Sequence, residues 1–156
     1  MFETTVIATD GSESASRAVR MALDVADRFG AAAHALYVVD ASALRASHEQ
    51  YRETVEESLR AAGIEALSSV EEHAADGAGG CGVVTAVRQG DPAEEILAYV
   101  DEVDADVVAT GTQGRHGTHA FLLGSVAETV VRQSPVPVLT VRQLGADERD
   151  GVAISY

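Results

Sequence analysis

The sequence contains no lysine. Its 156 residues include 25 aspartates and glutamates against 11 basic residues, all of them arginine, which gives a formal net charge of −14. The absence of lysine excludes a P-loop of the form G-x-x-x-x-G-K-[ST], because that loop needs its lysine on the β- and γ-phosphates. The acidic surplus argues against nonspecific binding to nucleic acid or to anionic membranes. A polyphosphate would have to be held by backbone N–H groups, hydroxyls, arginine or a metal ion.

Other residue types are scarce as well. Tryptophan is absent and aromatic residues make up 4% of the chain, so aliphatic side chains must fill the core. No apolar run approaches the roughly 18–20 residues that span a bilayer. Residues 1–5 show no secretory signal, and the single cysteine, Cys81, cannot form an internal disulfide, so we expect a cytoplasmic protein. An acidic composition without lysine is typical of proteins that work in concentrated salt, which predicts a halophilic source.

Short apolar segments alternate with amphipathic ones along the chain. The predicted strands are residues 4–9, 32–39, 81 or 82 to 88, 106–110 and 136–142. Four predicted helices lie between them: one starting at Ser12 or Ser14 and ending at Gly30, a long charged one over 44–75 that Gly63 interrupts, one starting at Asp91-Pro92, and one following Gly124. This alternation predicts an α/β fold with a parallel sheet and helices on both faces. Residues 1–142 form the predicted domain, and residues 143–156 a polar, acidic tail.

A glycine-bearing loop follows the fourth predicted strand. Gly111 and Gly114 are followed, nine residues later, by Gly124 and Ser125 at the start of the last helix. Glycines let backbone N–H groups approach an anion, and a helix N-terminus adds partial positive charge, so the loop is a candidate phosphate site. Two other interpretations stay open: Ser125 and Glu128 match the S-x-x-E capping box, and the glycines match ordinary turn residues.

Asp10 ends the first predicted strand. Ligands of doubly wound sheets sit beyond the carboxyl ends of the strands, where the strand order reverses. If the first and fourth strands are neighbours, Asp10 faces the glycine loop across one crevice and can bind ribose hydroxyls or help to hold a metal ion. The alternative is a turn-forming residue whose side chain accepts a local backbone hydrogen bond.

These motifs resemble the universal stress protein family, and within it the nucleotide-binding branch. That branch carries G-x2-G-x9-G-[ST] after its fourth strand, and this chain matches it without a gap at Gly111, Gly114, Gly124 and Ser125. The similarity extends over residues 4–142. It implies a doubly wound five-stranded parallel sheet of order 3-2-1-4-5, with four helices in a three-layer α/β/α sandwich.

The resemblance also implies a site for ATP, or for ADP or AMP. Asp10 would meet the adenosine, Ala8 and Thr9 would line the same wall, and Val38 would lie against adenine. The phosphate side would be formed by two groups of residues: Gly111, Gly114 and Arg115 with His116 nearby, and then Gly124, Ser125 and Val126. Mg²⁺ or Mn²⁺ would accompany the nucleotide.

Three functions are compatible with this resemblance. The first is a nucleotide-dependent regulator of the stress response that binds ATP, hydrolyses it little and acts on a regulatory protein partner. The second is a dimeric scaffold of the same fold whose pocket is empty or holds another adenine nucleotide, and the third is a slow ATPase. The family commonly dimerises through its fifth strand. Pro137 near the start of the segment Val136–Val141 agrees with an edge position for that strand.

Overall fold

The computed structural model describes residues 2–77, 82–113 and 123–144, and within them the chain forms one parallel sheet. The strand order is β3-β2-β1-β4-β5, as the resemblance implied. The strands are β1 (Thr4–Ala8), β2 (Ala32–Asp40), β3 (Val83–Gly90), β4 (Val107–Gly111) and β5 (Val138–Val141). β1 and β4 are therefore hydrogen-bonded neighbours at the point where the order reverses, and the predicted crevice has its frame.

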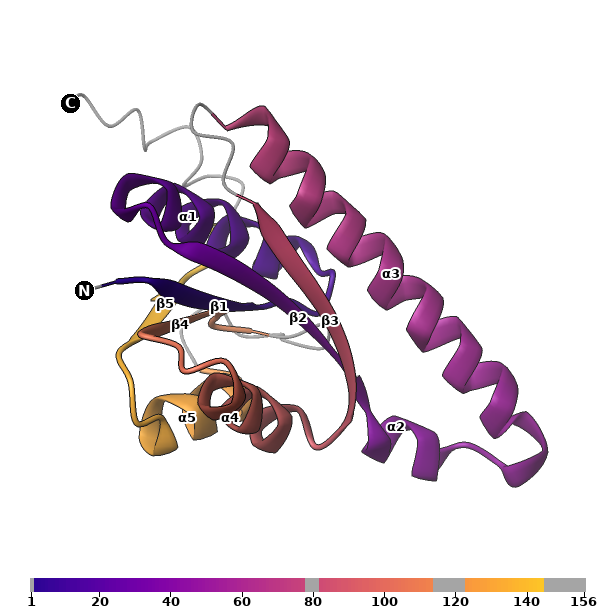
Figure 1. Cartoon of the computed structure of the whole chain (residues 1–156). Helices are drawn as coiled ribbons and strands as arrows, with labels where there is room; N and C mark the ends of the chain where they lie inside the picture. The colour runs from indigo at the N-terminus through magenta and orange to yellow at the C-terminus, as the bar shows by residue number, and fades with distance from the viewer. Residues whose placement is uncertain (1, 78–81, 114–122, 145–156) are drawn as a thin grey trace.

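The helices cover both faces of this sheet, in three layers (Figure 1). They are α1 (Glu13–Phe29), α2 (Ala41–Ala46), the 3₁₀ helix η1 (Glu49–Tyr51), α3 (Arg52–Asp76), α4 (Pro92–Glu102) and α5 (Ser125–Gln133). One core cluster packs α1 and α3 on Ile7 and Ala35, and the other packs α4 and α5 on Val6 and Leu36. Neighbouring residues of a strand thus serve opposite cores, because side chains alternate across a sheet.

Local signals place most helix ends. Ser12 caps α1 by accepting a hydrogen bond from the Ala15 N–H, and Gly30 ends the helix in the left-handed conformation with φ of 63°. Asp91 caps α4 through the Glu94 N–H, with Pro92 in the first turn. Both N-caps satisfy backbone donors that a helix start leaves without a partner.

The predicted helix over 44–75 was wrong in its bounds. The region forms α2, η1 and α3, so the described residues contain five α-helices and a 3₁₀ helix where four helices were predicted. α2 begins as soon as β2 ends, because the Asp40 side chain accepts from the Ser42 N–H and caps it.

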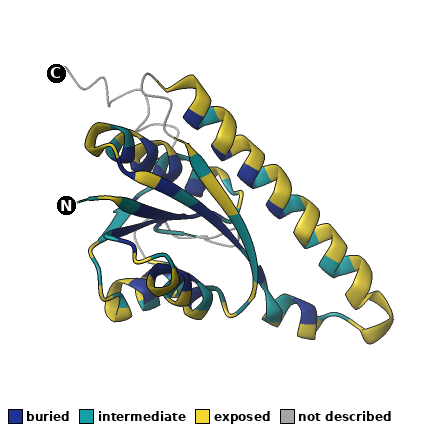
Figure 2. Ribbon diagram, in the orientation of Figure 1, coloured by how far each residue is buried: buried dark blue, intermediate teal, exposed yellow. Residues whose placement is uncertain are grey.

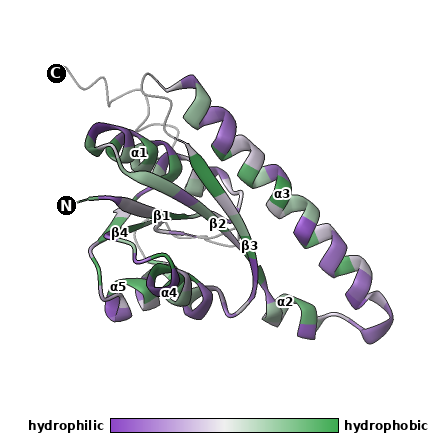
Figure 3. Cartoon of the chain, viewed as in Figure 1, coloured by the Kyte–Doolittle hydropathy of each residue, from purple (hydrophilic) through white to green (hydrophobic). Residues whose placement is uncertain are grey.

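Gly63 does not interrupt the long helix. It lies within α3, and a Cβ atom there would come within 2.5 Å of the Tyr37 ring, so its missing side chain allows α3 to pack closely on β2. The outer surface of α3 is exposed (Figure 2), and hydrophilic residues recur along it (Figure 3).

Two further segments bear on the predictions. β5 is shorter than predicted, since Pro137 precedes it and contributes only its carbonyl oxygen, 3.1 Å from the Val108 nitrogen. The predicted tail lies outside the described residues apart from residues 143 and 144. Within the parts of the chain that are described, no helix combines the length and apolar character needed to cross a membrane.

Candidate functional site

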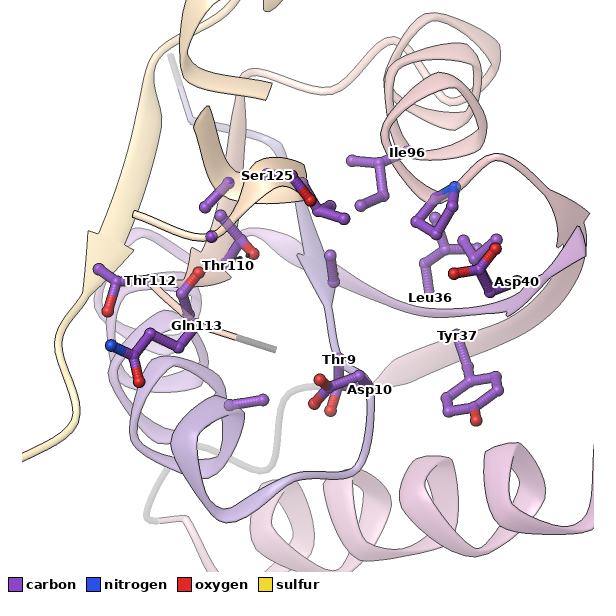
Figure 4. Close-up of a pocket in the computed structure, with 18 of the residues that line it drawn as sticks. Thr9, Asp10, Leu36, Tyr37, Asp40, Ile96, Thr110, Thr112, Gln113 and Ser125 are labelled. Atoms are coloured by element: carbon purple, nitrogen blue, oxygen red, sulfur yellow. Dashed lines mark hydrogen bonds between the residues drawn. The ribbon is translucent and has the colours of Figure 1, made fainter. Parts of the chain in front are cut away.

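A cavity of about 460 Å³ opens at the carboxyl ends of β1, β2 and β4. Its volume lies in the range of small-molecule sites. Eight predicted site residues line it: Ala8, Thr9, Asp10, Val38, Gly111, Gly124, Ser125 and Val126. The other three, Gly114, Arg115 and His116, lie outside the described residues. In Figure 4, Thr110, Thr112, Gln113 and Ser125 lie on one side of the cavity, Leu36, Tyr37 and Asp40 lie on the other, and Thr9 and Asp10 lie between them.

The helix start at this cavity is not capped by a side chain. Gly124 occupies the N-cap position of α5, and Ser125 is the first helical residue. The capping-box interpretation of Ser125 and Glu128, which the sequence left open, was therefore wrong: the box requires serine at the N-cap, and Ser125 lies one position further into the helix. Glu128 instead pairs with Arg132, with 2.8 Å between the Glu128 Oε1 and Arg132 Nη2 atoms.

An uncapped start leaves backbone donors at the cavity. The first helical hydrogen bond of α5 runs from the Glu128 N–H to the Gly124 carbonyl. The N–H groups of Ser125, Val126 and Ala127 consequently have no acceptor within the helix, and all three residues line the cavity. Such a group of donors at the positive end of a helix favours an anion.

Gly111 has a packing role that the glycine motif did not reveal. A Cβ atom there would lie 3.1 Å from the Ser14 carbonyl oxygen and 3.4 Å from the Ala15 Cα atom. The missing side chain thus lets the end of β4 meet the first turn of α1. Gly111 also lines the cavity, so close packing and backbone approach to a ligand are compatible at this position.

The two ends of the glycine loop lie together. The Gly124 N–H donates to the Thr112 carbonyl, with 2.7 Å between the two atoms. The chain therefore leaves the sheet and re-enters α5 at the same side of the cavity. Residues 114–122, which include Gly114, Arg115 and His116, connect these ends.

Asp10 has the turn-forming role, which is one of the two roles that the sequence left open. Its Oδ1 atom accepts from the Ser12 N–H at 2.9 Å, which forms the expected local turn. Gly11 follows with φ of 76°, a left-handed conformation that favours glycine, and its N–H donates to the Thr9 hydroxyl oxygen. The turn fixes Asp10 at the cavity wall, where its carboxylate can also meet a ligand.

The opposite end of the cavity is largely apolar and includes residues that the sequence analysis missed. Pro92 and Ile96 come from the start of α4, Leu59 from α3 and Ala43 from α2, beside Leu36 and Tyr37 of β2. The rule that ligands lie beyond the carboxyl ends of strands would have pointed to Pro92, which closely follows β3. No local pattern marks Leu59 or Ile96, because distant packing brings them there.

The described part of the cavity lining carries no basic side chain, and its acidic members are Asp10 and Asp40. The Asp40 carboxylate accepts from the Ser42 N–H and hydroxyl at 2.8 and 2.7 Å. The described residues also hold no group of three His, Cys, Asp or Glu side chains placed to bind a metal ion. In this part of the site, the groups that could attract an anion are therefore backbone N–H groups and hydroxyls.

Comparison with known proteins agrees with this architecture. The model of the universal stress protein family matches residues 1–142. The chain belongs to the universal stress protein family. Universal stress protein MJ0531 of Methanocaldococcus jannaschii is 36% identical over 144 residues, which cover 92% of this chain and 84% of that relative.

Solved structures of universal stress proteins share the fold. UspA from Lactobacillus plantarum superposes with a TM-score of 0.78 at 26% identity, over 90% of this chain and 98% of that one. A universal stress protein solved in complex with cAMP superposes with a TM-score of 0.65 at 26% identity, over 90% and 97% of the two chains. The sheet, its strand order and its helical layers are thus those of the family.

Proposed function

We propose that this universal stress protein binds ATP, with a divalent cation, in the crevice between β1 and β4. The observation that carries the proposal is that three helical N–H groups without an acceptor in the helix, those of Ser125, Val126 and Ala127, share one cavity with an apolar chamber. A nucleotide has the matching two ends: an anionic phosphate chain and a flat, weakly polar base. An adenine nucleotide is bound by one structural relative, the universal stress protein solved with cAMP.

The cavity suggests an orientation for the nucleotide. Its base lies at the apolar end, beside Val38, Leu36 and Ile96, while the ribose lies near Asp10 with Ala8 and Thr9 along the wall. The phosphates then lie at the opposite end of the cavity, which we call the phosphate end. It is formed by Gly111, Gly114, Arg115, His116, Gly124, Ser125 and Val126. Of these, Gly114, Arg115 and His116 are included on the family resemblance alone.

Mg²⁺ or Mn²⁺ accompanies the nucleotide in this proposal. A divalent ion neutralises charge on the phosphates, and it matters more in a chain of net charge −14 than in a neutral one. Hard oxygen ligands, from the phosphates and from water, suit such an ion. The Asp10 carboxylate lines the cavity and is the protein group that we expect to help to hold the ion.

We further propose that the protein acts as a nucleotide-dependent regulator of the stress response with little intrinsic hydrolysis. Hydrolysis needs a group that orients or deprotonates water next to the terminal phosphate. On the described cavity wall the carboxylates belong to Asp10 and Asp40, and in the proposed orientation they lie at the ribose and base ends and not beside the terminal phosphate. ATP then serves as a bound signal that a protein partner reads, and the cytoplasm is the expected compartment.

Calorimetry tests the binding proposal directly. Purified protein is titrated with ATP, ADP and AMP, each with and without Mg²⁺, and with GTP as a control for the base. Saturable ATP binding that Mg²⁺ strengthens is the expected result. Absence of binding at millimolar ATP would overturn the proposal.

Replacing Gly114 by valine should weaken ATP binding in a folded protein, because the side chain would block the approach of phosphate to the backbone. The same calorimetry measures the change in ATP affinity.

A dimeric scaffold remains the second candidate, and the edge position of β5 favours it. β5 pairs with β4 alone in the described sheet, and Val138, Leu139 and Thr140 are only half-buried. Exposed apolar edges invite pairing with another chain, so antiparallel pairing of two β5 strands would cover this one. Light scattering tests this pairing. The wild type is expected to have the mass of a dimer, and the Leu139→Arg variant the mass of a monomer.

A further inference from the structure

A buried serine on α1 contacts the loop that follows β4. Ser14 is 7% exposed, and its hydroxyl donates to the Gln113 carbonyl with 3.2 Å between the oxygen atoms, across 99 positions of sequence. Its own carbonyl oxygen is the nearest neighbour of the Cβ position at Gly111. Ser14 therefore packs against the end of β4 at Gly111, and it also donates a hydrogen bond to the loop that follows β4 at Gln113.

The hydrogen bonds around Ser14 have a defined direction. A serine hydroxyl has one proton to donate, and that of Ser14 goes to Gln113. The contact of 3.1 Å between the Ser12 and Ser14 hydroxyls is then donated by Ser12. The Ser12 N–H in turn donates to Asp10. A continuous chain thus joins the turn after β1 to the loop after β4, the two walls of the crevice.

This chain of hydrogen bonds ends at the side of the cavity where we propose that the phosphates bind. Gln113 follows Thr112, whose carbonyl accepts from the Gly124 N–H at the start of α5. Gln113, Thr112 and Gly124 all line the cavity, whereas the Ser14 side chain acts from behind this wall. Figure 4 shows Thr112 and Gln113 together on the side of the cavity that carries Ser125.

We propose that Ser14 is a positioning residue that holds Gly111 and Gln113, at the wall of the crevice beside the start of α5, in their binding geometry. The inference rests on the proposed nucleotide binding and adds a residue that contacts the loop and not the ligand. A loop held in advance loses less conformational freedom when a ligand binds, which strengthens binding. The effect should grow with the number of phosphates, because the base end has other walls.

The test compares Ser14→Ala with Ser16→Ala. Ser16 lies in the same turn of α1, but it is outside the cavity and its hydroxyl donates locally to the Glu13 carbonyl at 2.8 Å. Calorimetry of both variants with adenosine, AMP and ATP, each with Mg²⁺, gives the expected pattern. Ser14→Ala lowers ATP affinity about fivefold, the equivalent of one ordinary hydrogen bond, and changes adenosine affinity less than twofold. Ser16→Ala matches the wild type with all three ligands.

Amide hydrogen exchange without nucleotide provides a second measurement. Exchange at residues 110–113 is expected to be faster in Ser14→Ala than in Ser16→Ala. Unchanged ATP affinity in a folded Ser14→Ala protein would overturn the inference, and so would an equal loss for adenosine and ATP, which indicates a general loss of structure. A wild type that binds none of the three ligands overturns the proposed function itself, and the inference with it.

Discussion

Single residues at the crevice acquire their roles from neighbours that are distant in sequence. Gly111 is a motif glycine, yet its missing side chain also lets α1 pack on β4. Ser125 matches a capping pattern, yet Gly124 occupies the N-cap position. The first backbone N–H groups of α5 consequently have no acceptor within the helix. The same residue type can therefore serve packing, capping or binding, and only its surroundings decide among them.

This assignment changes what is expected of Ser125→Ala. Loss of a capping serine costs about 1 kcal/mol, but Ser125 is the first helical residue and makes no capping bond. The free energy of unfolding should therefore stay within about 0.5 kcal/mol of the wild type, as for an ordinary surface substitution. Urea unfolding measures it. A decrease of about 1 kcal/mol in the free energy of unfolding would mean that the Ser125 side chain does cap α5.

Thr5 is a buried residue whose hydroxyl we expect to reduce stability. It is 1% exposed, and its Oγ1 atom has no hydrogen-bond partner among the residues that the structure describes. Thr5→Val replaces the hydroxyl by a methyl group of similar size and removes this unpaired polar atom. We expect the free energy of unfolding to rise by about 1 kcal/mol in urea denaturation.

Thr110→Val is the matched control for that change. Thr110 is also buried, at 7% exposure, but its hydroxyl donates to the Gly111 carbonyl. The same substitution should therefore lower the free energy of unfolding at this position. Equal shifts for Thr5→Val and Thr110→Val would contradict the role of the unpaired hydroxyl.

At the scale of elements, close contacts between helices and strands shape the apolar end of the crevice. Gly63 brings α3 against Tyr37 of β2, and Leu59, one turn earlier in α3, lines the cavity. The position of α3 therefore sets one wall of the site. A glycine in the middle of a long helix serves this approach, although its intrinsic helix propensity is poor.

Gly63→Ala should destabilise the protein although alanine is the better helix former. The new Cβ atom would lie 2.5 Å from the Tyr37 ring, which must move. Overpacking of this kind costs about 1–3 kcal/mol, more than the roughly 1 kcal/mol that alanine adds to helix propensity. Thermal unfolding followed by circular dichroism measures the balance. Gly82→Ala, where a Cβ atom meets nothing within 4 Å, is the control and should unfold like the wild type.

Asp106 joins the starts of β1 and β4. Its Oδ2 atom accepts from the backbone N–H groups of Glu3 and Thr4, at 2.7 and 3.0 Å. These hydrogen bonds favour the charged carboxylate and lower the pKa of Asp106 below its ordinary value of 3.8. Because the pKa is lower in the folded state, the stabilisation is present above pH 3.8 and is lost as the pH falls towards the folded value.

Asp106→Asn should therefore lower stability most at neutral pH. The difference from the wild type is expected to shrink as the pH falls below 3.8, because the wild-type carboxyl then becomes neutral as well. Urea unfolding from pH 7 to pH 3 measures this trend. Asp104→Asn, a change two positions away, is the control for a general effect of charge. A stability difference that stays constant with pH would contradict the stabilising role of the charged Asp106 carboxylate.

At the scale of the whole molecule, net charge is the dominant property. A charge of −14 on 156 residues makes the compact state repel itself, and salt screens that repulsion. The acidic composition without lysine supports the proposal of a protein adapted to high salt. In the proposed function, phosphate binding likewise depends on helix donors and on a divalent ion that offsets negative charge.

Stability should therefore increase with ionic strength. We expect the midpoint of thermal unfolding to rise by several degrees between 0.1 and 2 M KCl, as screening removes repulsion among acidic side chains. Circular dichroism measures it, and an equally viscous sucrose series controls for nonspecific solvent effects. A midpoint that falls or stays level with KCl would contradict adaptation to salt.

The sequence by itself determined the fold class, and it indicated the edge of the sheet at which the candidate site lies. Its alternating apolar segments, the caps at Ser12 and Asp91 and the glycine at the end of α1 are local signals, and local signals survive in a single sequence. The resemblance supplied the strand order, and with it the neighbouring positions of β1 and β4. Eight predicted residues consequently line one cavity.

Only the tertiary structure decided how that cavity is built. It divided the segment over 44–75 into α2, η1 and α3, left α5 uncapped, and brought Ser14 to Gln113 and Leu59 and Ile96 to the wall. These features depend on contacts between segments that are far apart in the chain. Periodicity and short motifs describe a residue's immediate neighbours, so packing between layers lies beyond what they can specify.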